Sequence, residues 1–289
     1  MLIKVRAASV NPLDYHLKRF GPYLVRIPGR DVAGEVETVG WNVAQFKAGD
    51  EVFGSCRGAF AEYACTPESK LVMKPVNVTF EQAASVPVAG YTALQGLRDK
   101  RKIQPGHKVL INGAAGGVGT FAVQIAKWFG AEVTAVCSTR NGDLVRSIGA
   151  DHVIDYTRED FTKGTQRYDA IYDLVGNHPL LACRRVLNPK GIYIGAGVLA
   201  APPSVIGVLA GLIIPPMLSL FASQKFVTFM ARSSKEDLSI LGELMATGKV
   251  TPVIDRRYGL TQVAEAIRYV ETGHARGKVV ITVEHNERN

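Results

Sequence analysis

The stretch Lys108–Arg140, KVLINGAAGGVGTFAVQIAKWFGAEVTAVCSTR, decides the fold of this chain. It predicts a short apolar strand, a glycine-rich turn, an amphipathic helix and a second apolar strand. Ala114, Gly116 and Gly119 give the pattern A-x-G-x-x-G. Glycine suits this turn because the chain must bend tightly and let a pyrophosphate approach its backbone, beside the free N–H groups of the helix N-terminus. The stretch therefore predicts a dinucleotide-binding βαβ unit.

The predicted helix carries one apolar stripe. Its apolar residues recur at helical spacing, and they are Val118, Phe121, Ala122, Ile125, Ala126 and Phe129. A glycine-rich turn that merely packs a helix on a strand is the alternative interpretation. The position of the turn between a strand and a helix favours the dinucleotide site.

The end of the second strand indicates which dinucleotide binds. A site for NAD places Asp or Glu about 20 residues beyond the glycines, where the carboxylate accepts hydrogen bonds from the ribose hydroxyls. Here the strand ends in Ser138, Thr139 and Arg140, and the first carboxylate is that of Asp143. Hydroxyls and a guanidinium can bind the 2′-phosphate of NADP, which a carboxylate would repel. We predict NADPH as the cofactor; an exposed charge near a helix start is the alternative for Arg140.

Composition sets further limits. The chain has 289 residues, enough for two domains with their own cores, and 47% of them are hydrophobic, as in ordinary globular proteins. The net charge of +8 suits an anionic cofactor, but the dense basic run 98–102 has no interleaved aromatic residues, so no nucleic-acid partner is expected. The four cysteines form no C-x-x-C pair and the N-terminus has no signal-peptide core, which favours a reduced, cytoplasmic location.

The order of patterns along the chain indicates the architecture. Residues 1 to about 90 contain short strand-like runs separated by Gly, Pro and Asp turns. From about residue 92 to 197, apolar strands alternate with helices, which is typical of a doubly wound parallel sheet. A helix is expected over 234–248, where a Glu stands three residues after Ser233, followed by a helix over 260–272 and a strand over 277–283.

The segment Gly191–Gln224 contains no charged side chain. A membrane span is one interpretation, but two Pro-Pro pairs leave only eleven residues between them, 204–214, whereas a span needs about 20. Two other interpretations stay open: peripheral membrane contact through residues 198–222, and a buried segment that lines a cleft.

Taken together, these blocks resemble the zinc-independent branch of the medium-chain dehydrogenase/reductase superfamily, in particular its NADPH:quinone oxidoreductases and alkenal/enone reductases. The matching pieces are VRAASVNPLDY, PGRDVAGEVETVG, FKAGDEVFG, GAFAEYAC, VAGYTAL, INGAAGGVGTFAVQIAK, IGADHVIDY, YDLVGN and HARGKVVITV. The resemblance implies a Rossmann domain over residues 92–231 and a GroES-like β-barrel domain formed by 1–91 and 232–289, with the substrate cleft between them. It also implies hydride transfer from NADPH to a hydrophobic quinone or α,β-unsaturated carbonyl, and a homodimer.

The chain departs from the zinc-using relatives at their metal ligands. Where they carry His in a G-H-E motif, this chain has Arg30, whose guanidinium does not deprotonate to ligate zinc. The other ligand positions fall near Asn11 and Ser85, neither of which is Cys. No metal is therefore expected. Without a Lewis acid, an electrophilic acceptor suits the site better than an ordinary alcohol.

The resemblance implies cofactor contacts at matching positions. The expected cofactor-binding residues are Ala115, Gly116, Gly117, Val118, Gly119, Ser138, Arg140, Tyr156 and Asn177. The first five form the phosphate loop, and the serine and arginine match positions that hold the 2′-phosphate. The tyrosine is expected beside the adenine ribose and the asparagine near the nicotinamide ribose. Their alternative roles are a partly buried strand-end tyrosine and the N-cap of the next helix.

The expected catalytic residues lie near the N-terminus. Asn11 and the helix after it face the nicotinamide in relatives. Hydride transfer to a quinone or enone creates an oxyanion or enolate that must take up a proton. A histidine, with an ordinary pKa of about 6.5, can supply one, so His16 is a candidate and Tyr15 a second. A proton taken from water is the alternative.

The chain begins inside the strand LIKVRAASV, whereas relatives carry a hairpin before it. A barrel domain shortened at its N-terminus is therefore expected, with an edge open to association. This expectation motivates a second hypothesis from another class of protein: a catalytically weak NADPH-binding protein that serves as a redox sensor or scaffold.

Overall fold

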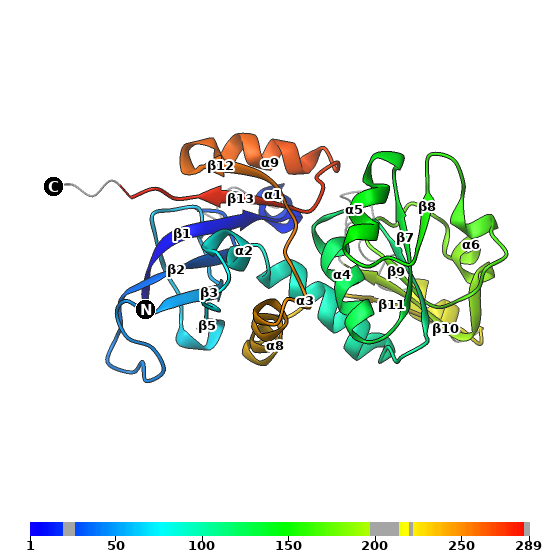
Figure 1. The fold of residues 1–289 in the computed structure, drawn as a ribbon, viewed down its shortest axis with the longest axis horizontal. Helices are drawn as coiled ribbons and strands as arrows, with labels where there is room; N and C mark the ends of the chain where they lie inside the picture. The colour runs from blue at the N-terminus through cyan, green and yellow to red at the C-terminus, as the bar shows by residue number, and fades with distance from the viewer. Residues whose placement is uncertain (20–26, 197–213, 220–221, 286–289) are drawn as a thin grey trace. The chain divides into compact units, whose positions relative to one another are not determined.

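The computed structural model describes residues 1–19, 27–196, 214–219 and 222–285, with the backbone alone at 16–19. The chain forms two compact units. Unit 1 contains Met1–Tyr91 and the chain from Ser233 onward, and unit 2 contains Thr92–Arg232 (Figure 1). Both ends of the chain thus contribute to unit 1.

Unit 2 is built on a parallel sheet. Its strands are β6 (Lys108–Asn112), β7 (Glu132–Cys137), β8 (His152–Asp155), β9 (Tyr168–Asp173), β10 (Leu187–Ala196) and β11 (Lys225–Phe229). They are ordered β11-β10-β9-β6-β7-β8, and every neighbouring pair is parallel. This is the strand order of a doubly wound dinucleotide-binding fold, in which the direction of winding reverses between β6 and β9. The predicted α/β class with a doubly wound parallel sheet is confirmed.

Short helices connect these strands. They are α4 (Gly117–Trp128), η3 (Thr139–Asn141), α5 (Gly142–Ser147), η4 (Phe161–Lys163) and α6 (Leu180–Arg185). One core of unit 2 contains Leu110, Val136 and Ile171 from three neighbouring strands. The packing of these apolar side chains holds the three strands together. The predicted cofactor residues follow the carboxyl ends of these strands.

Two further elements precede β6. Helix α3 (Pro87–Gln95) continues into η2 (Gly96–Arg101), a turn of π-helix. The basic run 98–102 ends this helix at Lys102, whose φ of 54° lies in the left-handed region. The run is therefore a helix terminus, as its composition indicates.

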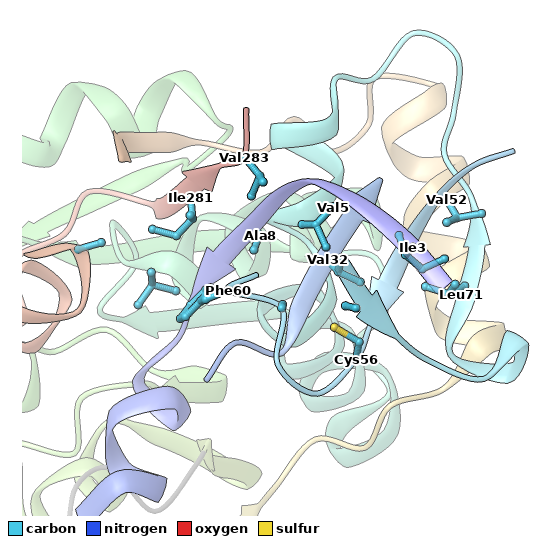
Figure 2. Close-up of a cluster of buried hydrophobic side chains, with 14 of the residues drawn as sticks. Ile3, Val5, Ala8, Val32, Val52, Cys56, Phe60, Leu71, Ile281 and Val283 are labelled. Atoms are coloured by element: carbon cyan, nitrogen blue, oxygen red, sulfur yellow. The ribbon is translucent and has the colours of Figure 1, made fainter. Parts of the chain in front are cut away.

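Unit 1 is built on a mainly antiparallel sheet. Its strands are β1 (Leu2–Val10), β2 (Asp31–Thr38), β3 (Glu51–Ser55), β4 (Tyr63–Cys65), β5 (Leu71–Met73), β12 (Ile254–Gly259) and β13 (Lys278–Thr282). Their order is β12-β13-β1-β2-β3-β5, with β4 also paired to β1. The buried side chains of one core cluster come from strands at both ends of the chain, including Val5, Val32 and Ile281 (Figure 2).

Four α-helices lie wholly within the described residues of unit 1. They are α1 (Pro12–Arg19), α2 (Phe80–Ala84), α8 (Lys235–Ala246) and α9 (Val263–Glu271), the last preceded by the turn η5 (Leu260–Gln262). Figure 1 shows α9 alongside β12 and β13. The helix predicted over 234–248 is α8, and the side chain of its N-cap, Ser234, accepts a hydrogen bond from the Asp237 N–H.

The uncharged segment 191–224 is described only in part. Its first residues end β10, and residues 214–219 are helical. Most of the stretch 198–222 predicted for membrane contact lies outside the described residues. No helix in the described ranges is long and apolar enough to cross a membrane.

Candidate functional site

The glycine turn between β6 and α4 is closely folded. Gly113 adopts a φ of +85°, which glycine tolerates. Its N–H and that of Ala114 donate to Val136 O on β7, at 3.2 and 3.1 Å. A Cβ on Gly119 would lie 2.2 Å from Gly113 O, so only glycine fits there. The turn therefore brings the start of α4 directly over the end of β6.

The N-terminus of α4 offers N–H groups that have no acceptor within the helix. The first N–H of this region bonded within the helix belongs to Thr120, which donates to Gly116 O at 3.0 Å. The N–H groups of Gly117, Val118 and Gly119 precede it and have no acceptor inside the helix. Gly116–Val118 are partly exposed, while Ala115 is buried. Such a helix end, with its partial positive charge, suits a phosphate group.

The predicted 2′-phosphate end follows β7. Ser138 is the N-cap of η3, and Arg140 lies exposed within this turn. Tyr156 follows the neighbouring strand β8, and its N–H donates to Cys137 O at 3.1 Å. Asn141 donates from Nδ2 to Ser138 Oγ at 3.2 Å, whereas its buried Oδ1 has no partner in the described part of the chain.

A carboxylate that no sequence pattern indicated also lies here. Asp155, at the end of β8, accepts hydrogen bonds from Thr139 Oγ1 and from Thr157 N and Oγ1, and lies 3.5 Å from Arg158 Nε. The Thr139 hydrogen bond is the main cause that holds the pKa of Asp155 below its ordinary value. The carboxylate of Asp155 is thus hydrogen-bonded and ion-paired to its neighbours. It lies beside the residues predicted to bind the 2′-phosphate.

A third group of polar side chains lies between β6 and β9. Asp173 Oδ1 accepts from Asn112 Nδ2 at 2.9 Å and from the N–H of Gly176 at 2.8 Å, and its Oδ2 accepts from Tyr193 Oη at 2.8 Å. Asn112 Nδ2 also donates to Asn177 Oδ1 at 2.9 Å. These hydrogen bonds fix the loop that carries Asn177 to the end of β6.

The alternative role of Asn177 as a helix N-cap is wrong. Helix α6 begins at Leu180, and its N-cap is Pro179. The intervening His-Pro pair keeps the chain extended before the helix begins, so the Asn177 side chain turns to Asn112 instead. The residues predicted to bind the cofactor therefore follow the carboxyl ends of four neighbouring strands, β8, β7, β6 and β9.

The predicted catalytic residues belong to unit 1. Asn11 is 2% exposed, and its side chain is bonded on both sides. Its Oδ1 accepts from Lys278 Nζ at 2.6 Å, and its Nδ2 donates to Asp31 Oδ2 at 2.8 Å and to Ser9 O at 3.4 Å. Spacing in the sequence could not connect Asn11 with Lys278, because 267 positions separate them.

The Asp31–Lys278 pair is fully enclosed. Lys278 Nζ lies 3.7 Å from Asp31 Oδ2, and both side chains are buried. Burial raises the pKa of Asp31, although the Lys278 charge opposes that shift. Burial likewise lowers the pKa of Lys278, against the attraction of Asp31. Hydrogen bonds from Ser9 Oγ and the Val88 N–H complete the environment of the carboxylate.

Asp14 fixes the start of α1. Its Oδ2 accepts from the Asn11 N–H at 2.8 Å, and its Oδ1 accepts from the Gly29 N–H at 3.2 Å. Burial raises its pKa to about 6. Tyr15 packs against the core of unit 1. His16 lies on α1, but its side chain is outside the described residues.

The positions that carry zinc ligands in other dehydrogenases are occupied by other residues here. Ser85 Oγ donates to Gln82 O at 2.7 Å, within the turn that ends α2. Among the residues that the structure describes, no three His, Cys, Asp or Glu side chains gather as a metal site would require. All four cysteines are free thiols, and Cys56, Cys137 and Cys183 are buried.

Comparison with known proteins identifies relatives over almost the whole chain. Residues 1–76 match the family described as alcohol dehydrogenase GroES-like domain, and residues 148–281 match the family described as zinc-binding dehydrogenase. The chain is 37% identical to 2-methylene-furan-3-one reductase of Solanum lycopersicum, over 97% of this chain and 71% of that protein. It is 36% identical to the chloroplastic NADPH-dependent alkenal/one oxidoreductase of Arabidopsis thaliana, with the same coverage of 97% and 71%.

A solved structure shares the fold. The quinone oxidoreductase from Coxiella burnetii aligns with a TM-score of 0.86 and 32% sequence identity, over 98% of this chain and 90% of that one. The similarity thus extends through both units.

Proposed function

Because this chain belongs to the medium-chain dehydrogenase/reductase family, in the branch of the quinone and enone oxidoreductases, we propose that it is an NADPH-dependent oxidoreductase. Its reaction transfers a hydride to a quinone or to an α,β-unsaturated carbonyl. The names of its relatives, which are an enone-type reductase, an alkenal/one oxidoreductase and a quinone oxidoreductase, support this class of acceptor.

The observation that carries the proposal is the glycine turn with the N–H groups at the start of α4 that have no acceptor within the helix. Gly113 and Gly119 let the turn fold closely against Val175 and against its own backbone, so that these N–H groups are available to a pyrophosphate. The backbone of Ala115, Gly116, Gly117 and Val118 would cradle the phosphates. Bound NADPH would supply the hydride from C4 of its nicotinamide. The residues of this chain then have to bind it, orient it and deliver a proton to the reduced acceptor.

Ser138 and Arg140 are the proposed partners of the 2′-phosphate. A guanidinium forms charge-assisted hydrogen bonds with a phosphate, and a hydroxyl adds a further donor. Tyr156 follows the next strand, at a place where its half-exposed ring can cover the adenine ribose. Asn177 is assigned to the nicotinamide ribose, because it follows β9 beside the glycine turn.

In unit 1, Asn11 acts as a positioning residue in this proposal. Both sides of its carboxamide are held by Lys278 and Asp31, so it fixes the backbone where α1 begins. Tyr15 and His16 on α1 remain the candidates for the proton donor. The proton goes to the oxyanion or enolate that hydride transfer creates.

The reaction is proposed to proceed without zinc. The guanidinium of Arg30 and the hydroxyl of Ser85 stand where zinc-using relatives carry ligands, and an arginine does not bind a metal cation. A quinone or enone is already electrophilic, so hydride transfer needs no Lewis acid to activate it. Dialysis against a strong chelator is expected to leave the activity unchanged.

The test is a screen of NADPH oxidation, followed by nicotinamide absorbance, with a panel of quinones and enones. Turnover with at least one acceptor is the expected result, and it should persist after chelation. Tight NADPH binding with no turnover on any acceptor would favour the second hypothesis, a redox-sensing or scaffold protein. Loss of turnover on chelation, restored by zinc, would contradict the zinc-independent mechanism.

Assembly and compartment are part of the proposal as well. We propose a homodimer in a reducing compartment such as the cytoplasm, where the four free thiols stay reduced. Light scattering coupled to size-exclusion chromatography would detect the dimer. Sedimentation with liposomes would test peripheral membrane contact through residues 198–222; recovery only in the supernatant would exclude it.

A further inference from the structure

Hydrogen bonds between β6 and β9 fix the orientation of the Asn177 carboxamide. The Asp173 carboxylate only accepts hydrogen bonds, so the atom of Asn112 that lies 2.9 Å from it is Nδ2. The same nitrogen lies 2.9 Å from the Asn177 side chain, which must therefore present Oδ1. The donor nitrogen of Asn177 is then on the other side of its carboxamide.

His178 provides a second donor to the same oxygen. Its Nδ1 lies 2.9 Å from Asn177 Oδ1, so Nδ1 carries a proton. Its Nε2 lies 3.3 Å from Asp160 Oδ1, which is again an acceptor. The imidazole of His178 thus lies between the Asn177 amide oxygen and the Asp160 carboxylate.

Asp160 is itself held in place. Its Oδ1 accepts from Thr162 N at 2.9 Å and Thr162 Oγ1 at 2.7 Å, at the start of η4. These hydrogen bonds hold the pKa of Asp160 below its ordinary value, so the carboxylate is ionised at neutral pH. Lys163 Nζ lies 3.9 Å from the other oxygen of Asp160, and the Phe161 ring packs 4.5 Å from the His178 ring. With 17% of its side chain exposed, His178 is largely shielded from water.

This group lies where a dinucleotide is expected. The winding of the sheet reverses between β6 and β9, and ligands of doubly wound sheets bind at the carboxyl ends of the strands at that point. Asn112 and Asp173 are the last residues of these two strands and are paired in register. Through Asn112, the last residue of β6, Asn177 is held at the strand end from which the glycine turn also starts.

We propose that His178 is a positioning residue for the cofactor: lying against Asp160 and donating from Nδ1, it holds Asn177 Oδ1 so that the Asn177 amide nitrogen is presented to the nicotinamide ribose. This inference rests on the proposed function, because the ribose is that of bound NADPH.

The test compares the NADPH affinity of the wild type, His178→Leu, His178→Gln and His152→Leu by nicotinamide fluorescence. Leucine removes the donor to Asn177 Oδ1, whereas glutamine keeps a side-chain donor. His152, which pairs with Glu132 at 3.1 Å on an exposed strand end, is the matched control. The Kd of His178→Leu should be about tenfold that of the wild type, and the Kd of His178→Gln should stay within about threefold of it.

The Kd of His152→Leu should equal that of the wild type. Equal Kd values for His178→Leu and the wild type, or an equal loss in His178→Gln, would contradict the inference and leave the proposed function intact. Absence of NADPH binding by the wild type would contradict the proposed function, and this inference with it. Nitrogen NMR of the folded wild type gives an independent readout: a His178 Nδ1 that carries no proton would also overturn the inference, even if the leucine variant fails to fold.

Discussion

At the scale of single residues, Arg140 is proposed to select the nicotinamide cofactor. Its guanidinium is proposed to hold the 2′-phosphate, a group that NADH lacks. Replacing it with alanine should raise the Kd for NADPH about tenfold or more, since a hydrogen bond between charged groups contributes roughly 1.5–3 kcal/mol. The Kd for NADH should not change. Fluorescence titration of both cofactors measures this, and an equal loss for both would contradict the assignment.

The carboxyl group of Asp14 should make the stability of the protein depend on pH. Burial raises its pKa from 3.8 to about 6, so the folded protein binds this proton more tightly than the unfolded chain does. The contribution of Asp14 to the free energy of unfolding therefore falls as the pH rises from about 4 to about 6, by roughly 3 kcal/mol. Across this pH range, the free energy of unfolding measured in urea should decline less, or rise more, for Asp14→Asn than for the wild type. Parallel curves for the two proteins would show that Asp14 is not shifted.

The ammonium of Lys278 neutralises part of the buried charge of unit 1. Lys278→Met removes the cation and leaves Asp31 and Asn11 Oδ1 without it. Breaking a buried ion pair in this way should lower the free energy of unfolding by roughly 3–5 kcal/mol. Arg257→Met, which removes an exposed ion pair with Glu81 at 2.7 Å, is the control and should cost about 1 kcal/mol or less. Equal losses in urea unfolding would contradict the role given to Lys278.

The buried network around Asn11 marks the limit of prediction from sequence at this scale. The sequence singled out Asn11 by resemblance, but gave no sign that Asp14, Asp31 and Lys278 surround it. Strands β1 and β13 bring these residues together through antiparallel pairing between the two ends of the chain. Such contacts depend on tertiary packing, which local spacing does not encode.

At the scale of elements, the β6–α4 connection depends more on Gly119 than on Gly116. A Cβ on Gly119 would lie 2.2 Å from Gly113 O and 2.7 Å from backbone atoms of Ala114, whereas the nearest atom to a Cβ on Gly116 is 3.4 Å away. Gly119→Ala should therefore lower the free energy of unfolding by about 1–3 kcal/mol and weaken NADPH binding. Gly116→Ala, the matched control, should change stability by no more than about 0.5 kcal/mol. Equal stability of the two variants in urea unfolding would contradict this account of the turn.

Elements with strong local signals were predictable, and short ones were not. The strand, glycine turn and helix from Lys108 to Trp128 follow from periodicity and turn chemistry, and they are confirmed. Helix α2 was missed because its five residues are too few to show an apolar period. The signal was nevertheless present, since Thr79 and Gln82 form a capping box at its start.

At the scale of the whole molecule, each unit brings part of the machinery that hydride transfer requires. Unit 2 carries the glycine turn and the residues proposed to bind NADPH, at the carboxyl ends of four neighbouring strands. Unit 1 carries α1 with its candidate proton donors, fixed by Asp14 and the buried network. Relatives that share 35–37% of its residues across both units support the same activity for the whole chain.

The most direct test of the central claim follows the hydride itself. Purified protein is incubated with an enone and with NADPH deuterated at C4 of the nicotinamide, and the product is analysed by mass spectrometry. We predict a saturated carbonyl product that carries one deuterium at the carbon β to the carbonyl group, with NADPH consumed in equal amount. NADPH that binds but is not consumed, or a reduced product free of deuterium from either deuterated C4 position, would contradict direct hydride transfer.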